Sequence, residues 1–122
     1  MKRTLLRAST KPLRRHGPVK ARNAQRHAKE WARAYHSPAR VRWVAAQPCV
    51  VCGMTPSENA HIQTGGMGRK ANYQYIVPMC STAHRNFHQH GREFGDSRSL
   101  DLPALARLTE QRWLEHQRRQ EG

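Results

Sequence analysis

Acidic side chains are scarce in this chain. Its 122 residues include 22 lysines and arginines but only 8 aspartates and glutamates, which gives a formal net charge of +14. Glu30 is the only acidic residue among the first 48. A basic field of this kind attracts phosphate backbones and releases their counterions on binding. The charge therefore predicts a nucleic-acid partner; the alternative is a solvated basic tail that only keeps the protein soluble.

Long apolar runs are also missing. Hydrophobic residues make up 37% of the chain, and no run approaches the length that crosses a bilayer. The basic stretch has no strong leucine or phenylalanine face, so a membrane surface is not the expected partner. The basic start is not followed by the apolar segment of a secretory signal. We therefore expect a cytoplasmic protein.

Cysteine is rare as well, with three residues. An odd count without a secretory signal argues against a disulfide framework and for free thiolates in a reducing compartment. All three lie in one segment, Cys49-x2-Cys52 followed by Cys80-x3-His84-x3-His88. Two thiolates at this spacing can bind one tetrahedral Zn²⁺, and Cys80 with His84 can supply the second pair. The alternative is that the cysteines are small buried hydrophobic residues.

His84 is also a candidate ligand for a second metal ion. It lies four residues before His88 on a predicted helix, so the two imidazoles share a face and can bind one ion. The pattern leaves both assignments of His84 open, to the zinc and to this second ion.

A chain this short forms one small domain, because it cannot supply two independent cores. Residues 1–20 are basic, are interrupted by Pro12, Gly17 and Pro18, and show no hydrophobic period. We expect them to be a disordered arm that orders on nucleic acid, followed by one domain at 21–122. The predicted nucleic-acid-binding residues are Lys11, Arg14, Arg15, Lys20, Arg22, Arg26, Lys29, Arg69 and Lys70.

The residue pattern predicts a mixed α+β fold. Apolar residues at three- and four-residue spacing predict a helix over 21–36 with an alanine-rich face that includes Trp31. Ser37-Pro38 is an N-cap followed by proline at the first helical position, which starts a helix over 38–46. Gly53 permits the positive φ of a metal knuckle. Two short strands at 60–63 and 75–79, a helix at 81–90 ended by Gly91, and a last helix at 102–120 capped by Asp101 complete the prediction.

The order of these motifs resembles the HNH nucleases, whose fold is the ββα-metal or His-Me finger unit. The resemblance covers residues 49–91: Cys49-x2-Cys52-Gly53, then Ala60-His61-Ile62, then a Gly-rich loop leading to Asn72, then Ile76-Val77-Pro78-Met79-Cys80 and the histidine-bearing helix. It is closest to the small phage and prophage HNH proteins, including the recombination-enhancing nuclease group. It implies a zinc-stapled ββα-metal core flanked by helices at both ends.

The resemblance also implies roles for individual residues. His61 would be the general base that deprotonates the water attacking phosphorus, and Asn72 would hold strand and loop so that the His61 ring points correctly. His88 with His84 would hold a divalent ion on the scissile phosphate, while Cys49, Cys52 and Cys80, with His84 as the candidate fourth ligand, would hold a structural zinc. Because acids are few near the motif, a borderline metal is favoured over Mg²⁺ among Mg²⁺, Mn²⁺ and Ni²⁺.

The function implied is therefore a metal-dependent DNA endonuclease with a role in phage or prophage recombination or DNA processing. It would act as a monomer in the host cytoplasm on duplex or single-stranded DNA without sequence preference, with a recombination protein as a candidate partner. The alternative is a non-catalytic, zinc-stabilised DNA-binding module, since Ala60 and Ala83 stand where relatives carry metal ligands. A zinc-ribbon protein that binds other polypeptides is a third, weaker reading.

Overall fold

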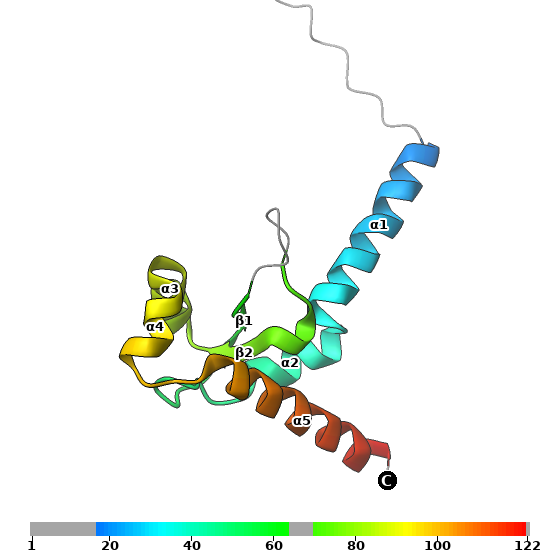
Figure 1. The fold of residues 1–122 in the computed structure, drawn as a ribbon. Helices are drawn as coiled ribbons and strands as arrows, with labels where there is room; N and C mark the ends of the chain where they lie inside the picture. The colour runs from blue at the N-terminus through cyan, green and yellow to red at the C-terminus, as the bar shows by residue number, and fades with distance from the viewer. Residues whose placement is uncertain (1–16, 64–69, 122) are drawn as a thin grey trace, which may run out of the picture. The chain divides into compact units, whose positions relative to one another are not determined.

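The computed structural model describes residues 17–63 and 70–121, with side chains described from residue 23 onward. The chain divides into two compact units, Met1–Glu30 and Trp31–Gly122. In order, the elements are α1 (Gly17–Tyr35), α2 (Pro38–Ala45), β1 (Glu58–His61), the 3-10 turn η2 (Tyr73–Tyr75), β2 (Ile76–Met79), α3 (Ser81–His90), α4 (Arg92–Ser97) and α5 (Leu102–Glu121). The predicted α+β class is confirmed: the described residues are mostly helical, with one small two-stranded sheet (Figure 1).

The first helix begins earlier than predicted. Residues 17–20, which we expected in the arm, are the first residues of α1. Pro18 does not prevent this because the first turn of a helix has no intrahelical partner for its N–H groups. The prediction that residues 1–16 form a disordered arm falls outside the described residues. Ala24, Ala28 and Trp31, which we assigned to an apolar face, are exposed, and Ala34 is the buried residue of the last turn.

The second unit is organised around the β1–β2 hairpin. The strands are antiparallel, and His61 lies opposite Ile76 while Glu58 lies opposite Met79. All four residues of β2 are buried, whereas β1 buries only Ala60. The helices α2 and α5 pack on β2, and α3 follows β2 directly and packs on both strands and on α4. The sheet thus holds the end of β1 and the start of α3 in fixed relation.

Three predicted start signals are confirmed. The Ser37 hydroxyl accepts a hydrogen bond from the backbone N–H of Arg40, and Pro38 is the first residue of α2. The Asp101 carboxylate accepts from the backbone N–H of Ala104 at 3.1 Å at the start of α5. On α5, Thr109 rather than Leu108 is buried, and its hydroxyl donates to the Leu105 carbonyl at 2.8 Å, so the burial leaves this hydroxyl paired.

The short helix α4 was not predicted. Gly95 lies inside it, where a glycine in sequence indicates a break. A Cβ at this position would lie 3.2 Å from the Leu100 carbonyl oxygen and 3.3 Å from the Leu102 side chain. The missing side chain therefore lets α4 approach the chain that enters α5, with Phe94 buried beside it. Within the described residues, no helix combines the length and the apolar character needed to cross a membrane.

A buried ion pair joins α2 to α5. Arg40 is fully buried, its Nη2 donates to Glu110 Oε1 at 2.9 Å, and its guanidinium lies 5.1 Å from the centre of the Tyr73 ring. Removing one partner of a buried pair leaves the other charge without compensation, at a cost of roughly 3–5 kcal/mol. Burial already lowers the pKa of Arg40, and Glu110 opposes that effect.

We expect Glu110→Ala to lower the free energy of unfolding by about 3 kcal/mol, because it leaves the buried Arg40 charge without its ion-pair partner. Glu121→Ala, at an exposed position on the same helix, is the matched control and should change stability by less than about 0.5 kcal/mol. Urea unfolding followed by circular dichroism measures both. Equal stability of the two variants would show that the pair contributes nothing.

Candidate functional site

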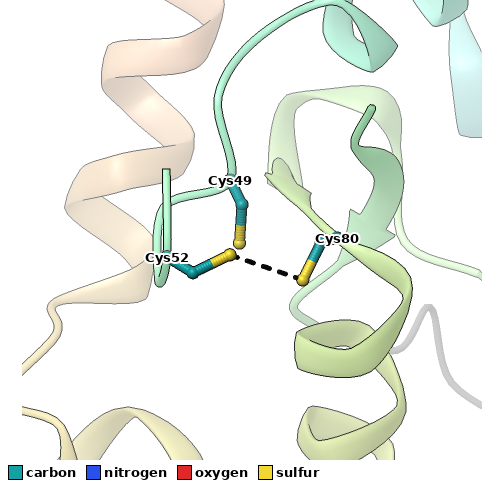
Figure 2. Close-up of side chains that lie close together, drawn as sticks. All are labelled: Cys49, Cys52 and Cys80. Atoms are coloured by element: carbon teal, nitrogen blue, oxygen red, sulfur yellow. Dashed lines mark hydrogen bonds between the residues drawn. The ribbon is translucent and has the colours of Figure 1, made fainter. Parts of the chain in front are cut away.

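The three cysteines come together at the base of α3. Cys49 and Cys52 flank a tight turn, and Cys80 is the N-cap residue of α3. Their sulfur atoms all lie within 4.8 Å of one another, and those of Cys52 and Cys80 are 3.6 Å apart (Figure 2). Four ligands about 2.3 Å from a tetrahedral zinc ion stand roughly 3.8 Å apart. The spacing of these thiols therefore fits a single metal ion.

The local backbone supports this arrangement. Gly53 has the predicted positive φ, 77°, and its N–H donates to the Cys49 carbonyl at 2.8 Å, closing the turn. The backbone N–H of Val51 donates to the sulfur of Cys49, and that of Ala83 donates to the sulfur of Cys80. These donors stabilise negative charge on the sulfur atoms.

The pKa values of the Cys49 and Cys52 thiols are shifted in opposite directions. Burial raises the pKa of the Cys49 thiol, but hydrogen bonds from backbone groups at Cys52, Cys80 and Val51 outweigh burial and bring the pKa to about 7. The backbone of Met54 lowers the pKa of Cys52, yet the neighbouring Cys80 thiol, desolvation and the Cys49 thiol together outweigh it and raise the pKa overall. Without a cation the cluster thus resists full ionisation, and a divalent ion would relieve the repulsion.

His84 does not join this cluster. Among the described residues, the ligand atoms that converge there are the three sulfurs alone. The His84 Nδ1 instead lies 2.8 Å from Glu58 Oε1, and its ring centre lies 4.5 Å from that of His88. The His84 ring thus lies beside His88 and outside the thiol cluster, and its assignment to either ion stays a prediction. Glu58 is an acidic neighbour that the sequence did not assign to the site.

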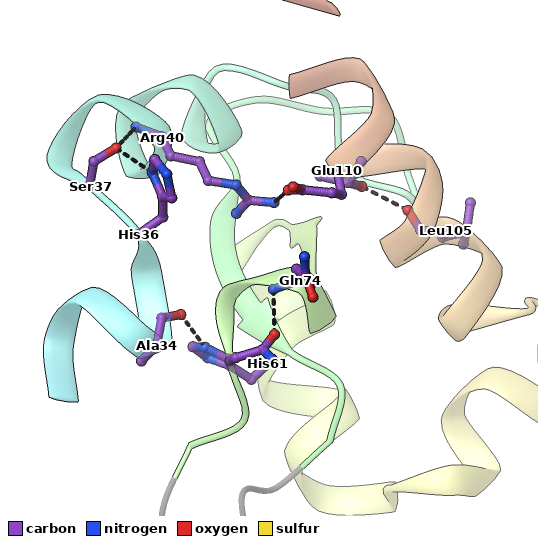
Figure 3. Close-up of polar contacts among 10 residues, drawn as sticks. Ala34, His36, Ser37, Arg40, His61, Gln74, Leu105 and Glu110 are labelled. Atoms are coloured by element: carbon purple, nitrogen blue, oxygen red, sulfur yellow. Dashed lines mark hydrogen bonds and ion pairs between the residues drawn. The ribbon is translucent and has the colours of Figure 1, made fainter. Parts of the chain in front are cut away.

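His61 is held by the end of α1. Its Nε2 lies 2.7 Å from the carbonyl oxygen of Ala34 (Figure 3). The His61 ring also packs edge-on against Tyr35, with ring centres 5.1 Å apart. The last carbonyls of a helix have no intrahelical partner, so this oxygen is free to accept. The contact makes Nε2 the protonated nitrogen and leaves the lone pair on Nδ1. Sequence reasoning missed Ala34, because a backbone acceptor has no residue signature.

The surroundings favour the neutral form of this imidazole. Burial lowers the pKa of His61, the Ala34 carbonyl opposes it, and the positive charges of Lys70, His84 and Arg33 lower it further. A neutral ring at cellular pH can accept a proton, as a general base must.

Asn72 has a local contact. Its side-chain oxygen accepts from the backbone N–H of Gln74 at 2.8 Å and so caps η2. The carbonyl of Tyr75, at the end of this turn, accepts from the N–H of Ile62, the residue after His61. Asn72 therefore orders the turn beside His61, while the recorded partner of the His61 ring is Ala34. The predicted orienting role stays a prediction, and these contacts make it an indirect one.

His61 and His88 line the same cavity, which has a volume of about 520 Å³. Its wall includes the apolar side chains of Ile62, Phe87 and Leu102, and Arg92 adds a positive charge. The hairpin contributes His61 and the helix α3 contributes His88, so the cavity unites two residues that the sequence assigned to catalysis. Arg92 and the apolar wall were not predicted, since α4 itself was not.

The predicted nucleic-acid-binding residues are only partly described. Arg26 and Lys29 are exposed on α1, and Lys70 is exposed where its carbonyl accepts from Arg33 Nη2 at 2.9 Å. The side chains of Lys20 and Arg22, and the whole of Lys11, Arg14, Arg15 and Arg69, lie outside the described residues.

Comparison with known proteins gives a family and one relative. The model of the family described as "Protein of unknown function (DUF968)" matches residues 25–113, well over half of the chain. The chain is also 34% identical over 70 residues to "Uncharacterized protein YdfU" of Escherichia coli (strain K12); the match covers 55% of this chain but 20% of that relative, so the chain spans about a fifth of its length. No solved structure matches. The family match includes all three cysteines, His61 and His88, and this chain belongs to the DUF968 family.

Proposed function

We propose that this protein is a metal-dependent DNA endonuclease of the HNH type, which hydrolyses phosphodiester bonds. The observation that carries the proposal is that His61 and His88, from separate elements, line one cavity of about 520 Å³. The element order agrees with it: β1 carries His61 at its end, β2 returns beside it, and α3 follows with His84 and His88. This is the ββα order that the resemblance implies.

The chemistry follows from the contacts of His61. With Nε2–H donated to the Ala34 carbonyl, Nδ1 accepts a proton from a water molecule, and the resulting hydroxide attacks phosphorus while the ester oxygen leaves. Arg92 on the cavity wall offers a positive charge to the phosphate. His88 and His84 would hold a divalent cation, which supplies neutralisation of the charge on the leaving oxygen.

Two further features complete the proposal. The ion at Cys49, Cys52 and Cys80 would be a structural zinc, since thiolates are its preferred ligands and the cluster joins the knuckle to α3. The net charge of +14 and the exposed Arg26, Lys29 and Lys70 would bind the DNA backbone without reading its sequence.

A second candidate is a DNA-binding module without activity. It is favoured by Ala60 and Ala83, which are buried in the apolar core and present no ligand atom where the HNH pattern has one. In this case the thiolate site would be structural and the cavity would serve no reaction.

Supercoiled plasmid separates the two candidates. Zinc-loaded protein should convert it to nicked and linear forms with Mn²⁺, Ni²⁺ or Mg²⁺, EDTA should stop the reaction, and added Mn²⁺ but not Zn²⁺ alone should restore it. Gel shift on the same plasmid records binding. Retarded plasmid that stays supercoiled with every cation would support the binding module and overturn the nuclease.

A further inference from the structure

The thiolate centre has three protein ligands in the part of the chain that the structure describes. Cys49, Cys52 and Cys80 contribute three sulfurs, and no histidine, aspartate or glutamate of the described residues places an atom within the same 4.8 Å group. Residues 64–69 contain none of the four ligand types, and His16 is the only one among residues 1–22. Zinc in structural sites is four-coordinate, so a metal ion held here by three protein sulfurs keeps one position that the described residues do not fill.

The neighbouring residues of α3 place no ligand atom among the three sulfurs. Ala83 lies against Cys80, but it has no side-chain donor, and its N–H donates to the Cys80 sulfur at 3.4 Å. His84 is the next residue, and its Nδ1 is paired with Glu58 at 2.8 Å. The ring also packs against His88 rather than against a cysteine. The first turn of α3 therefore offers the metal one thiolate and no imidazole.

The site is accessible and its charge selects the ligand. Cys49 is buried, whereas Cys52 is exposed and Cys80 is half-buried. Three thiolates around a divalent ion carry a net charge of −1, which disfavours an anionic fourth ligand. A neutral imidazole nitrogen matches the preferences of zinc without adding charge, whereas a thiol would bind as the thiolate and add a negative charge.

We propose that the metal centre of Cys49, Cys52 and Cys80 has an exchangeable fourth position, held by water in the isolated protein, which takes a neutral imidazole from outside the chain. The inference rests on the metal-binding part of the proposed function and is independent of nuclease activity.

Cobalt substitution tests this inference. Untagged protein, reduced with a phosphine and loaded with Co²⁺, should show sulfur-to-cobalt charge-transfer bands, and added imidazole should shift the visible bands in one saturable step. Phosphate at the same concentration, as an anionic donor, should have no effect. Bands that do not move with imidazole would mean a closed four-ligand site and overturn the proposal.

Three variants identify any fourth ligand from the chain itself. His84→Ala and His16→Ala should give the parent spectrum and the parent response to imidazole, as should His90→Ala, the matched control at an exposed histidine on α3. A changed spectrum in His84→Ala or His16→Ala alone, restored by imidazole, would make that histidine the fourth ligand and overturn the proposal. The cobalt spectrum does not depend on plasmid nicking. A failure of the nuclease assignment can therefore be told apart from a failure of the open fourth position.

Discussion

His61→Ala is expected to lower the rate of plasmid nicking by about a hundredfold or more, the usual scale for removal of a general base. Zinc content, melting temperature and DNA affinity should stay near those of the parent, because the His61 ring is only half-buried and contributes one hydrogen bond to the Ala34 carbonyl. Single-turnover nicking with saturating Mn²⁺ measures the chemical step. His90→Ala, at an exposed histidine on α3, is the matched control and should cut like the parent.

The pH dependence of plasmid nicking should also report the protonation of His61. Burial lowers the pKa of His61, so the neutral and active form persists below the ordinary histidine value of 6.5. Nicking should therefore be at its plateau at pH 7 and fall as acid protonates the ring, with a midpoint below 6.5. The residual activity of His61→Ala should lack this step. If His61→Ala cuts as fast as the parent, the nuclease assignment fails and the binding module replaces it.

Cys52→Ser is expected to unfold the second unit or to abolish zinc binding. Cys52 is exposed, so its packing contributes little, and burial alone predicts a change of less than about 0.5 kcal/mol. A metal ligand is different, because binding of structural zinc supplies roughly 10 kcal/mol or more of apparent folding free energy in small domains. Cys49→Ser should behave in the same way although Cys49 is buried. Zinc analysis and thermal melting with and without a chelator measure the effect.

Met54→Ser is the control for this prediction. Met54 lies in the same turn and is 65% exposed, so its replacement should leave zinc content and melting temperature near those of the parent. A Cys52→Ser protein that melts like Met54→Ser, or a parent protein free of zinc, would contradict the metal centre and leave the cysteines as ordinary side chains.

Local physical chemistry made most of the fold predictable. The Ser37-Pro38 and Asp101 caps act within one helical turn, and Gly53 supplies its positive φ within one turn of chain. Each signal depends on residues a few positions apart, so the sequence contains all of it. The bounds of α2, α3 and α5 follow the prediction within one residue for this reason. The convergence of the cysteines was predictable too, since their spacing is a metal-ligand pattern.

Long-range contacts decided the rest. In the sequence alone, Gly95 indicates a break in a helix. The structure shows that Leu100 and Leu102 occupy the space that a Cβ at Gly95 would need. The hydrogen bond that selects the tautomer of His61 comes from a backbone carbonyl 27 residues away. Every residue has a backbone carbonyl, so neither the residue pattern nor the spacing predicts that the Ala34 carbonyl is the partner of His61.

The site shows the same division. The sequence by itself determined the ligand types, the basic charge and the pairing of His84 with His88 on one helix face. The tertiary structure alone decided that Glu58, 26 residues away, contacts His84, and that His84 lies outside the thiolate cluster. The physical reason is that spacing along a helix fixes which side chains share a face, whereas the pairing of β1 with β2 fixes which strand residue that face meets.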